Sequence, residues 1–251
     1  MITNRQCKEL QELVKKAKAR RETGLFIAEG ERIVREIPPA LISSVYVSES
    51  YAASERLPEG AEVLSDAQFL KIADTKTPQG ILAVAKIPAF DPAILRKRNG
   101  LFLLLEAIQD PGNLGTIFRV AEGAGVDAIV LNQKTADPYA PKTVRSTMGS
   151  IFRQPHFLTE DAGNTVMMWK QQGIKVYAAH LAGTVRYDQA DYQTGAAFLI
   201  GNEGNGLTDA LAALSDTRVV IPMRGKLESL NAGVAASLLV YEAARQRGFQ
   251  G

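Results

Sequence analysis

Residues 99–251 alternate between short apolar runs and helical patterns, and this alternation limits the possible folds more than any other feature of the chain. The run LFLLLE at 101–106 is continuously apolar, as is typical of a strand buried on both faces of a parallel sheet. Further strand-like runs follow at 127–132, 156–158, 174–180, 196–201 and 218–223. Helical patterns lie between or after them, at 114–123, 141–150, 162–172, beyond Gly206 and at 231–246. The alternation predicts an open, mostly parallel α/β sheet covered by helices.

The first part of the chain has shorter elements. A helical pattern over 4–19 is followed by strand-like runs and short helices, which predict a small α/β domain over residues 1–90. The stretch 88–100, PAFDPAILRKRNG, holds two prolines and three consecutive basic residues, Arg96 to Arg98. We therefore expect a linker at 91–98 and a second domain at 99–251.

Composition excludes several classes of protein. The 251 residues are 46% hydrophobic and 22% charged, which is typical of a globular chain rather than a disordered one. No apolar run approaches the roughly 18–20 residues of a membrane span, and the N-terminus lacks the apolar core of a signal peptide. One cysteine, Cys7, excludes an internal disulfide, and two distant histidines do not suggest a metal site. We expect a cytoplasmic protein that binds no metal and no membrane.

The charge is unevenly distributed. Residues 1–98 hold 16 basic and 13 acidic side chains, whereas residues 99–251 hold 13 and 14. Seven basic residues fall between positions 5 and 21, against two acidic ones. Such a segment could lie on a phosphate backbone, although a solvated helix face is the more common meaning of a charge run.

Three loops, each after a predicted strand, carry residue types suited to binding. Residues 109–119 read QDPGNLGTIFR, where Asn113 can cap the following helix and Arg119 lies one to two turns into it. Residues 200–207 read IGNEGNGL and allow a ligand close to the backbone, but without GK[ST] they do not form a P-loop. Residues 221–233 read IPMRGKLESLNAG, with Ser229 as a natural N-cap beside Asn231. Because the carboxyl ends of parallel strands share one edge of a sheet, we expect these loops to meet there.

Each loop alone also has a purely structural interpretation. The first could be an ordinary strand–helix turn with a surface arginine, the second a flexible turn, and the third a helix cap. Only the three together make a specific signal.

The motifs NLGTIFR, IGNEGNGL and IPMRGKLESLNAGVAASLLVYE occur in this order between residues 109 and 242. They resemble the three motifs of the SpoU/TrmH class of SPOUT RNA 2′-O-ribose methyltransferases. The segment KARRETGLFIAEGERIVRE at 18–36 resembles the small substrate-binding domain, similar to ribosomal protein L30e, that precedes the catalytic domain in many members. The resemblance covers nearly the whole chain.

This resemblance implies an L30e-like α/β domain followed by a SPOUT domain with a trefoil knot. It also implies S-adenosylmethionine as cofactor and an obligate homodimer. Among RNA substrates it favours 23S ribosomal RNA, with transfer RNA as the alternative.

The resemblance further implies roles for individual residues. Arg119 would be the central catalytic residue, and its constant positive charge favours positioning the hydroxyl over accepting its proton. The other catalytic candidates are Asn113, Ser229 and Asn231. The candidates for the cofactor pocket are Gly201, Asn202, Glu203, Gly204, Ile221, Met223 and Leu230, with Glu203 shaping the loop. The candidates for RNA contacts are Lys18, Arg20, Arg21 and Arg145.

Two other classes of function remain open at this point. A non-catalytic RNA-binding protein could keep the fold, although a decayed site should have lost Arg119, Asn113 or Asn231. A different nucleotide-binding α/β enzyme is disfavoured, because the chain has neither a P-loop nor a dinucleotide fingerprint in the right context.

Overall fold

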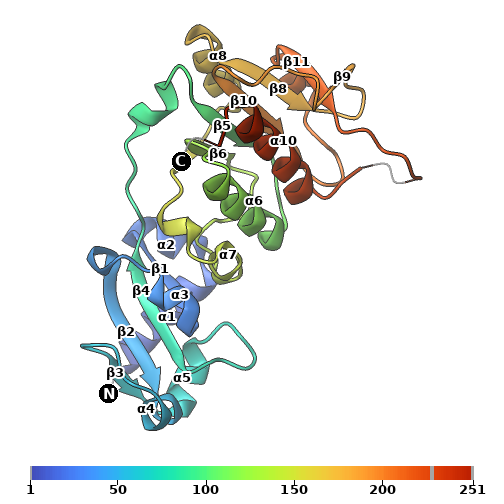
Figure 1. Ribbon diagram of the computed structural model, residues 1–251. Coiled ribbons are helices and arrows are strands. Elements are labelled where there is room, and N and C mark those ends of the chain that lie inside the picture. The colour runs from blue at the N-terminus through green and yellow to red at the C-terminus, as the bar shows by residue number, and fades with distance from the viewer. Residues whose placement is uncertain (1, 227–228, 250–251) are drawn as a thin grey trace. The chain divides into compact units, whose positions relative to one another are not determined.

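The computed structural model describes residues 2–226 and 229–249, and the chain divides into two compact units (Figure 1). Unit 1 comprises Met1–Ala89 together with Asp137–Phe152. Unit 2 comprises Phe90–Ala136 and Arg153–Gly251. The segment 137–152, which we call the insert, therefore packs with the first part of the chain although it lies between two strands of the second.

Unit 1 is built on a four-stranded sheet in the order β1-β4-β2-β3. The strands are β1 (Leu25–Glu29), β2 (Ile42–Ser48), β3 (Glu62–Leu64) and β4 (Ile81–Lys86). β4 pairs antiparallel with β1 and β2, and β3 pairs parallel with β2. The helices are α1 (Asn4–Lys15), α2 (Ala17–Thr23), α3 (Glu31–Arg35), α4 (Glu49–Ser54), α5 (Asp66–Ile72) and, in the insert, α7 (Pro141–Thr147), with 3-10 turns at Pro39–Leu41 and Ser150–Phe152.

The single helix expected over 4–19 is broken in two at Lys16, whose φ of −120° and ψ of 113° are extended. The break leaves carbonyl groups without partners at the end of α1. The guanidinium of Arg20 on α2 donates to two of them, those of Leu13 and Val14. A buried arginine thus satisfies the helix end that it follows.

The insert joins unit 1 through aromatic packing. Phe26 on β1 lies against Tyr139 and Phe152, with ring centroids 5.0 and 5.8 Å away. Val144 on α7 is completely buried. Because these apolar side chains leave water together, the insert contributes to the stability of the first domain.

Unit 2 holds a seven-stranded sheet in the order β7-β6-β5-β10-β8-β11-β9, and its strand pairings are all parallel. The strands are β5 (Leu101–Leu105), β6 (Ala128–Asn132), β7 (His156–Thr159), β8 (Lys175–Ala179), β9 (Val185–Arg186), β10 (Ala196–Ile200) and β11 (Thr217–Val220). β5 and β10 are buried at every position, as the continuous apolar runs predict. The parallel sheet expected from the sequence is confirmed.

The helices of unit 2 are α6 (Pro111–Gly123), α8 (Ala162–Gln171), α9 (Asp209–Ala213) and α10 (Ala232–Gln246), with a 3-10 turn at Pro92–Arg96. α6 and α10 lie side by side (Figure 1), and a side chain at Gly233 would touch Thr116. Under α8, Trp169 stacks on Phe102 at 5.2 Å and donates its indole N–H to the carbonyl of Leu95.

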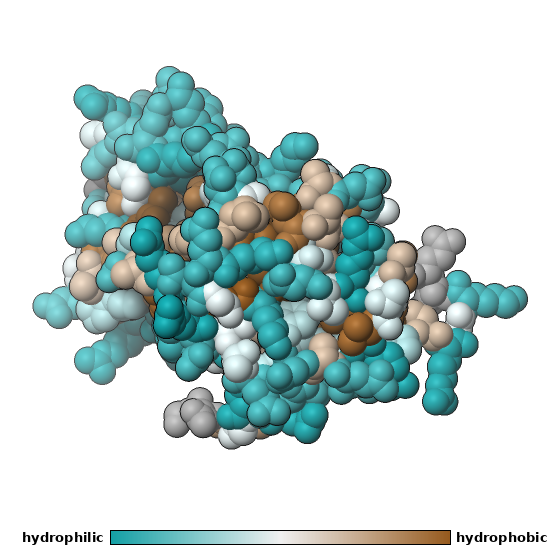
Figure 2. Space-filling model, turned by 90° about the horizontal axis from the view of Figure 1, so that it is seen from above, coloured by the Kyte–Doolittle hydropathy of each residue, from teal (hydrophilic) through white to brown (hydrophobic). Residues whose placement is uncertain are grey.

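Most of the face shown in Figure 2 is hydrophilic, with hydrophobic side chains between the polar ones. Within the described residues, no helix is both long and apolar enough to cross a bilayer. The same residues contain no group of three or more His, Cys, Asp or Glu side chains placed to hold a metal ion.

Candidate functional site

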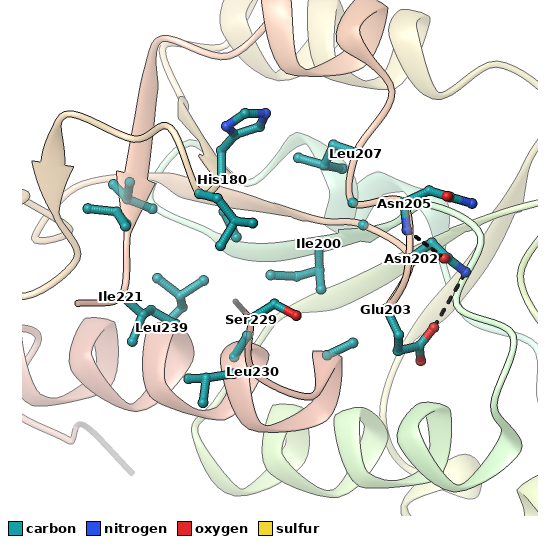
Figure 3. A pocket seen from close by; sticks show the side chains of 18 of the residues that line it. His180, Ile200, Asn202, Glu203, Asn205, Leu207, Ile221, Ser229, Leu230 and Leu239 are labelled. Atoms are coloured by element: carbon teal, nitrogen blue, oxygen red, sulfur yellow. Dashed lines mark hydrogen bonds between the residues drawn. The ribbon is translucent and has the colours of Figure 1, made fainter. Parts of the chain in front are cut away.

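The carboxyl ends of β8, β10 and β11 border a cavity of about 270 Å³ in unit 2, which we call the edge cavity (Figure 3). In Figure 3, His180 and Leu207 lie on one side of it and Ser229, Leu230 and Leu239 on the other. The residues that line it are Ala179, His180, Leu181, Ile200, Gly201, Asn202, Glu203, Gly204, Asn205, Gly206, Leu207, Val219, Val220, Ile221, Met223, Ser229, Leu230, Ala232, Ala235 and Leu239. A cavity at this edge is where open parallel sheets bind ligands.

One wall of the edge cavity is the glycine-rich loop after β10. Its ends are closed by two backbone hydrogen bonds between Asn202 and Gly206, at 3.0 and 2.9 Å. A Cβ atom at Gly201 would overlap backbone atoms of Gly206 and Leu207, so only glycine allows this close approach. Gly206 itself has φ +68°, a conformation that other residues rarely adopt. Gly201 and Gly206 therefore bring backbone close together at the wall of the edge cavity.

A chain of side-chain hydrogen bonds connects the three predicted motifs. Asn231 donates from Nδ2 to Oδ1 of Asn113 at 2.7 Å. Asn113 donates in turn from Nδ2 to Oε1 of Glu203 at 2.6 Å. Asn202 then donates to Glu203 at 3.5 Å and to the carbonyl of Ala107 at 2.9 Å. We call this series the amide chain; it ties the starts of α6 and α10 to the glycine-rich loop.

The structure corrects two expected helix caps. Asp110, not Asn113, caps α6, because its Oδ1 accepts from the backbone N–H of Asn113 at 2.8 Å. Asn231, not Ser229, caps α10, because its Oδ1 accepts from the N–H groups of Gly233 and Val234. The side chain of Asn113 is thereby left for the amide chain, and Ser229 is left to line the edge cavity.

The predicted cofactor residues all line the edge cavity, and Ser229 joins them. Asn113 and Asn231 do not line it but bond to each other beside it. Arg119, two turns beyond Asn113 on α6, is exposed and makes no hydrogen bond or ion pair with any residue that the structure describes. A guanidinium in that state is available for an anionic ligand.

Sequence reasoning missed His180, Leu181 and Asn205 as cavity residues. His180 follows β8, and its Nδ1 accepts from the N–H of Ala182 at 3.0 Å. The rule that ligands bind at strand ends could have found it, since 174–180 was recognised as a strand. The loop after His180 has one glycine, Gly183, whereas the loop 200–207 has three. The sequence therefore marks the first loop less clearly as a binding loop.

The predicted RNA contacts of unit 1 divide into two kinds. Lys18 and Arg21 are exposed, Lys18 lying 3.7 Å from Glu22. Arg20, in contrast, is only 4% exposed and donates twice to Asp137, at 2.9 and 2.7 Å. Its assignment as an RNA contact is therefore wrong, because the buried guanidinium donates its hydrogen bonds to groups within unit 1.

Arg145 on α7 is also engaged within unit 1. Its Nη2 lies 2.6 Å from Oδ2 of Asp74, and its Nη1 lies 3.8 Å from the carboxylate of Glu29. Glu29 is 3% exposed and accepts from the backbone of Asp74 and Thr75. Arg145, a candidate RNA contact, thus belongs to an ion-pair cluster that fixes the insert within unit 1.

Comparisons with known proteins match both parts of the chain. Residues 100–241 match the model of the SpoU rRNA Methylase family, and residues 4–83 match the MRM3-like substrate binding domain. A 23S rRNA (guanosine(2553)-2'-O)-methyltransferase, RlmP, of Bacillus subtilis is 38% identical over 228 residues, covering 89% of this chain and 90% of that protein.

Solved structures agree with the sequence match. The SpoU methyltransferase AviRb of Streptomyces viridochromogenes, in complex with AdoMet, superposes with a TM-score of 0.83 at 27% identity, covering 98% of each chain. An AdoMet-bound rRNA methyltransferase of Sinorhizobium meliloti superposes with a TM-score of 0.81 at 31% identity, covering 98% of this chain and 96% of the other. These likenesses confirm the predicted SPOUT fold, with its small first domain and its C-terminal parallel sheet.

In this chain, three motifs converge on a backbone-lined cavity at the edge of a parallel sheet. The family model matches more than half of this chain, and the Bacillus relative aligns over 89% of it. The chain therefore belongs to the SpoU rRNA methylase family.

Proposed function

We propose that this protein transfers a methyl group from S-adenosylmethionine to a ribose 2′-hydroxyl of 23S ribosomal RNA. The observation that carries the proposal is the amide chain, which holds the three motif loops together beside the edge cavity. The names of the Bacillus and Streptomyces relatives, both 23S rRNA 2′-O-methyltransferases, favour ribosomal over transfer RNA.

The lining of the edge cavity fits an adenosine-containing cofactor. Apolar side chains stand on its walls, among them Leu207, Ile221 and Leu230, and can pack against a base. The loop from Gly201 to Gly206 presents backbone at close range because a Cβ at Gly201 cannot be accommodated. Backbone groups next to apolar walls are the combination that fixes a nucleoside in orientation. When bound there, S-adenosylmethionine supplies an electrophilic methyl group on a sulfonium.

Arg119 is proposed to hold the target nucleotide. Its planar guanidinium can bind a phosphate with two parallel hydrogen bonds and can orient the neighbouring 2′-hydroxyl. It remains protonated at any physiological pH, so the hydroxyl proton passes to a phosphate oxygen or to water. Alignment of this kind is worth about 7–11 kcal/mol at most, enough to carry much of the rate enhancement.

Asn113 and Asn231 are proposed to position the reacting groups. Their amides are already oriented, because Asn231 caps α10 with its oxygen and Asn113 bonds to Glu203. Ser229 presents its hydroxyl at the wall of the edge cavity between β11 and α10. Glu203 acts through Asn113 by holding that side chain in place.

The first domain is proposed to read the RNA, as its match to a substrate-binding domain suggests. We retain the boundaries 1–90, 91–98 and 99–251 as a proposal, with the insert added to the first domain, and Lys18 and Arg21 as RNA contacts.

A homodimer is also proposed, because α10 and the residues after it present apolar side chains to solvent. Val234, Tyr241 and Phe249 are 42–59% exposed. Cytoplasmic localisation follows from the proposed substrate.

The proposal is tested by incubating the purified protein with tritiated S-adenosylmethionine and, separately, with 23S rRNA and bulk tRNA transcripts. We expect label in 23S rRNA at one nucleotide whose 3′ bond becomes resistant to alkali, the signature of a 2′-O-methyl group. Label in tRNA alone would favour the alternative substrate. RNA binding with no transfer to either substrate would support the non-catalytic alternative.

A further inference from the structure

The loop between β11 and α10 carries two cations beside the edge cavity. Met223 at its start and Ser229 near its end both line that cavity. Between them, Arg224 and Lys226 are exposed, and a side chain at Gly225 would meet nothing within 4 Å. In Figure 1 the part of this loop that follows β11, up to the grey trace, extends away from the rest of unit 2. The two charges therefore stand in open solvent, a few residues from the cavity wall.

Several other cations of unit 2 are neutralised by an acidic partner, whereas these two form no ion pair with a described residue. Arg186 pairs with Asp188 at 2.7 Å, and Arg245 pairs with Glu242 at 2.8 Å. Arg224 and Lys226, like Arg119, form no ion pair or hydrogen bond with any residue in the ranges that the structure describes. Unneutralised positive charge of this kind attracts a polyanion.

We propose that Arg224 and Lys226 bind backbone phosphates of the target RNA next to the nucleotide held by Arg119. Two residues of chain span at most about 7 Å, so the two side chains can contact one phosphate or two successive ones. The proposal rests on the proposed function, because it takes the edge cavity as the place where the methyl group is transferred. Met223 and Ser229 then line the cofactor pocket, while Arg224 and Lys226 hold the substrate strand.

The test is the salt dependence of RNA binding by the double variant Arg224→Gln/Lys226→Gln. Each lost phosphate contact lowers the slope of log affinity against log salt by about 0.7 for single-stranded RNA, so the slope should fall by about 1.4. Affinity is measured by filter binding of a 23S rRNA transcript, with the full-length protein, between 50 and 200 mM salt. The KM for RNA should rise while kcat and the calorimetric Kd for S-adenosylmethionine stay near those of the unmodified protein.

Two further variants isolate the cause. Arg186→Gln/Arg218→Gln removes the same charge from exposed residues of β9 and β11, and its slope should be unchanged. The exchange Arg224→Lys/Lys226→Arg keeps the charge and should keep the slope.

An unchanged slope in the first double variant would overturn the proposal, as would an equal fall in the charge-matched control. A shift in the dimer dissociation constant by sedimentation, without a change in slope, would assign the two cations to a subunit interface instead. Because the slope is a binding measurement, it distinguishes this failure from a failure of the proposed function, in which no methyl group would be transferred by the unmodified protein.

Discussion

Two arginines of unit 1, Arg20 and Arg145, are used in the opposite way to Arg119 of unit 2. In unit 1, Arg20 and Arg145 lie against Asp137 and Asp74, and Arg20 also closes the end of α1. In unit 2, Arg119 is exposed on α6, the helix whose first turn joins the amide chain beside the edge cavity. The first arrangement stabilises a fold, and the second leaves a charge ready for a ligand.

The neighbours of a basic residue, rather than its place in a charge run, therefore decide its role. A buried charge is tolerated only when it is paired and hydrogen-bonded, so Arg20 requires Asp137 and the carbonyl groups that it reaches. An exposed charge needs no partner and can be selected for binding alone. Substitutions that remove one kind of arginine or the other should therefore separate stability from catalysis and binding.

The largest effect is expected for Arg20→Met. This change leaves the carboxylate of Asp137 without its partner and two carbonyls of α1 without a donor, so the free energy of unfolding should fall by about 3–5 kcal/mol. Urea denaturation measures it. Lys18→Met, two residues away on the same helix and exposed, is the control and should change stability by less than about 0.5 kcal/mol. A stable Arg20→Met protein with weakened RNA binding would reverse our division of roles.

The next largest effect is expected for Arg119→Ala, on catalysis and not on stability. Loss of a donor that orients the reacting groups should lower kcat by about 10²–10³. The Kd for S-adenosylmethionine and the midpoint of thermal unfolding should remain near those of the unmodified protein. Arg119→Lys should recover little, because an ammonium does not reproduce the planar pair of donors. Turnover by the alanine variant at the original rate would remove Arg119 from the site.

A third prediction extends the contrast to the histidines. His156 on β7 is 7% exposed, and burial lowers its pKa to about 4, below the ordinary value near 6.5. The unfolded chain thus binds more protons between these values, and stability is lost as the pH falls from 6.5 to 4, by up to about 3 kcal/mol. Urea midpoints across this range measure the loss.

The matched variants are His156→Phe and His180→Phe. His156→Phe should flatten the pH profile, since its neighbours Phe90 and Phe118 already form an aromatic environment. His180→Phe, at the edge cavity, should leave the dependence of the urea midpoint on pH as it is in the unmodified protein. An NMR titration that places His156 near its ordinary pKa would contradict the prediction directly.

The smallest effect is expected for Lys18→Gln combined with Arg21→Gln. These side chains are exposed, so unfolding should change by less than about 0.5 kcal/mol. If both contact phosphates, the salt slope of RNA binding should fall by about 0.7–0.9 for each. A slope equal to that of the unmodified protein would mean that α2 faces solvent in the complex. The run of basic residues between positions 5 and 21 would then be a solvated helix face.

The fold of unit 2 could be predicted largely because its strands are apolar throughout. β5 and β10 are recognisable as continuous runs, and all the strands expected there are present. The order of strands could not be predicted, because nothing local says that β8 lies between β10 and β11. β9 has only two residues, Val185 and Arg186, and is too short to leave a periodic pattern.

The site was predictable to the level of motifs but not of contacts. The three loops identify the residues, yet the pairing of Asn113 with Asn231 joins positions 118 apart in sequence. Which asparagine caps a helix depends on where the helix begins, and α6 begins earlier than its apolar pattern indicates, at Pro111. The burial of Arg20 depends on Asp137, 117 residues away, and on a break in a helix that the sequence presents as continuous.

The insert has a consequence for how such an enzyme can change. The chain passes between the two units at three places, after Ala89, after Ala136 and after Phe152. The first domain therefore cannot be exchanged by a cut at the linker alone. A foreign domain would have to pack against Tyr139, Val144 and Phe152 of the insert, which would remain with the second part of the chain. A chimaera that takes a new first domain must take the corresponding insert with it. Recruitment of a new RNA thus requires paired changes at distant positions of one gene rather than a single fusion.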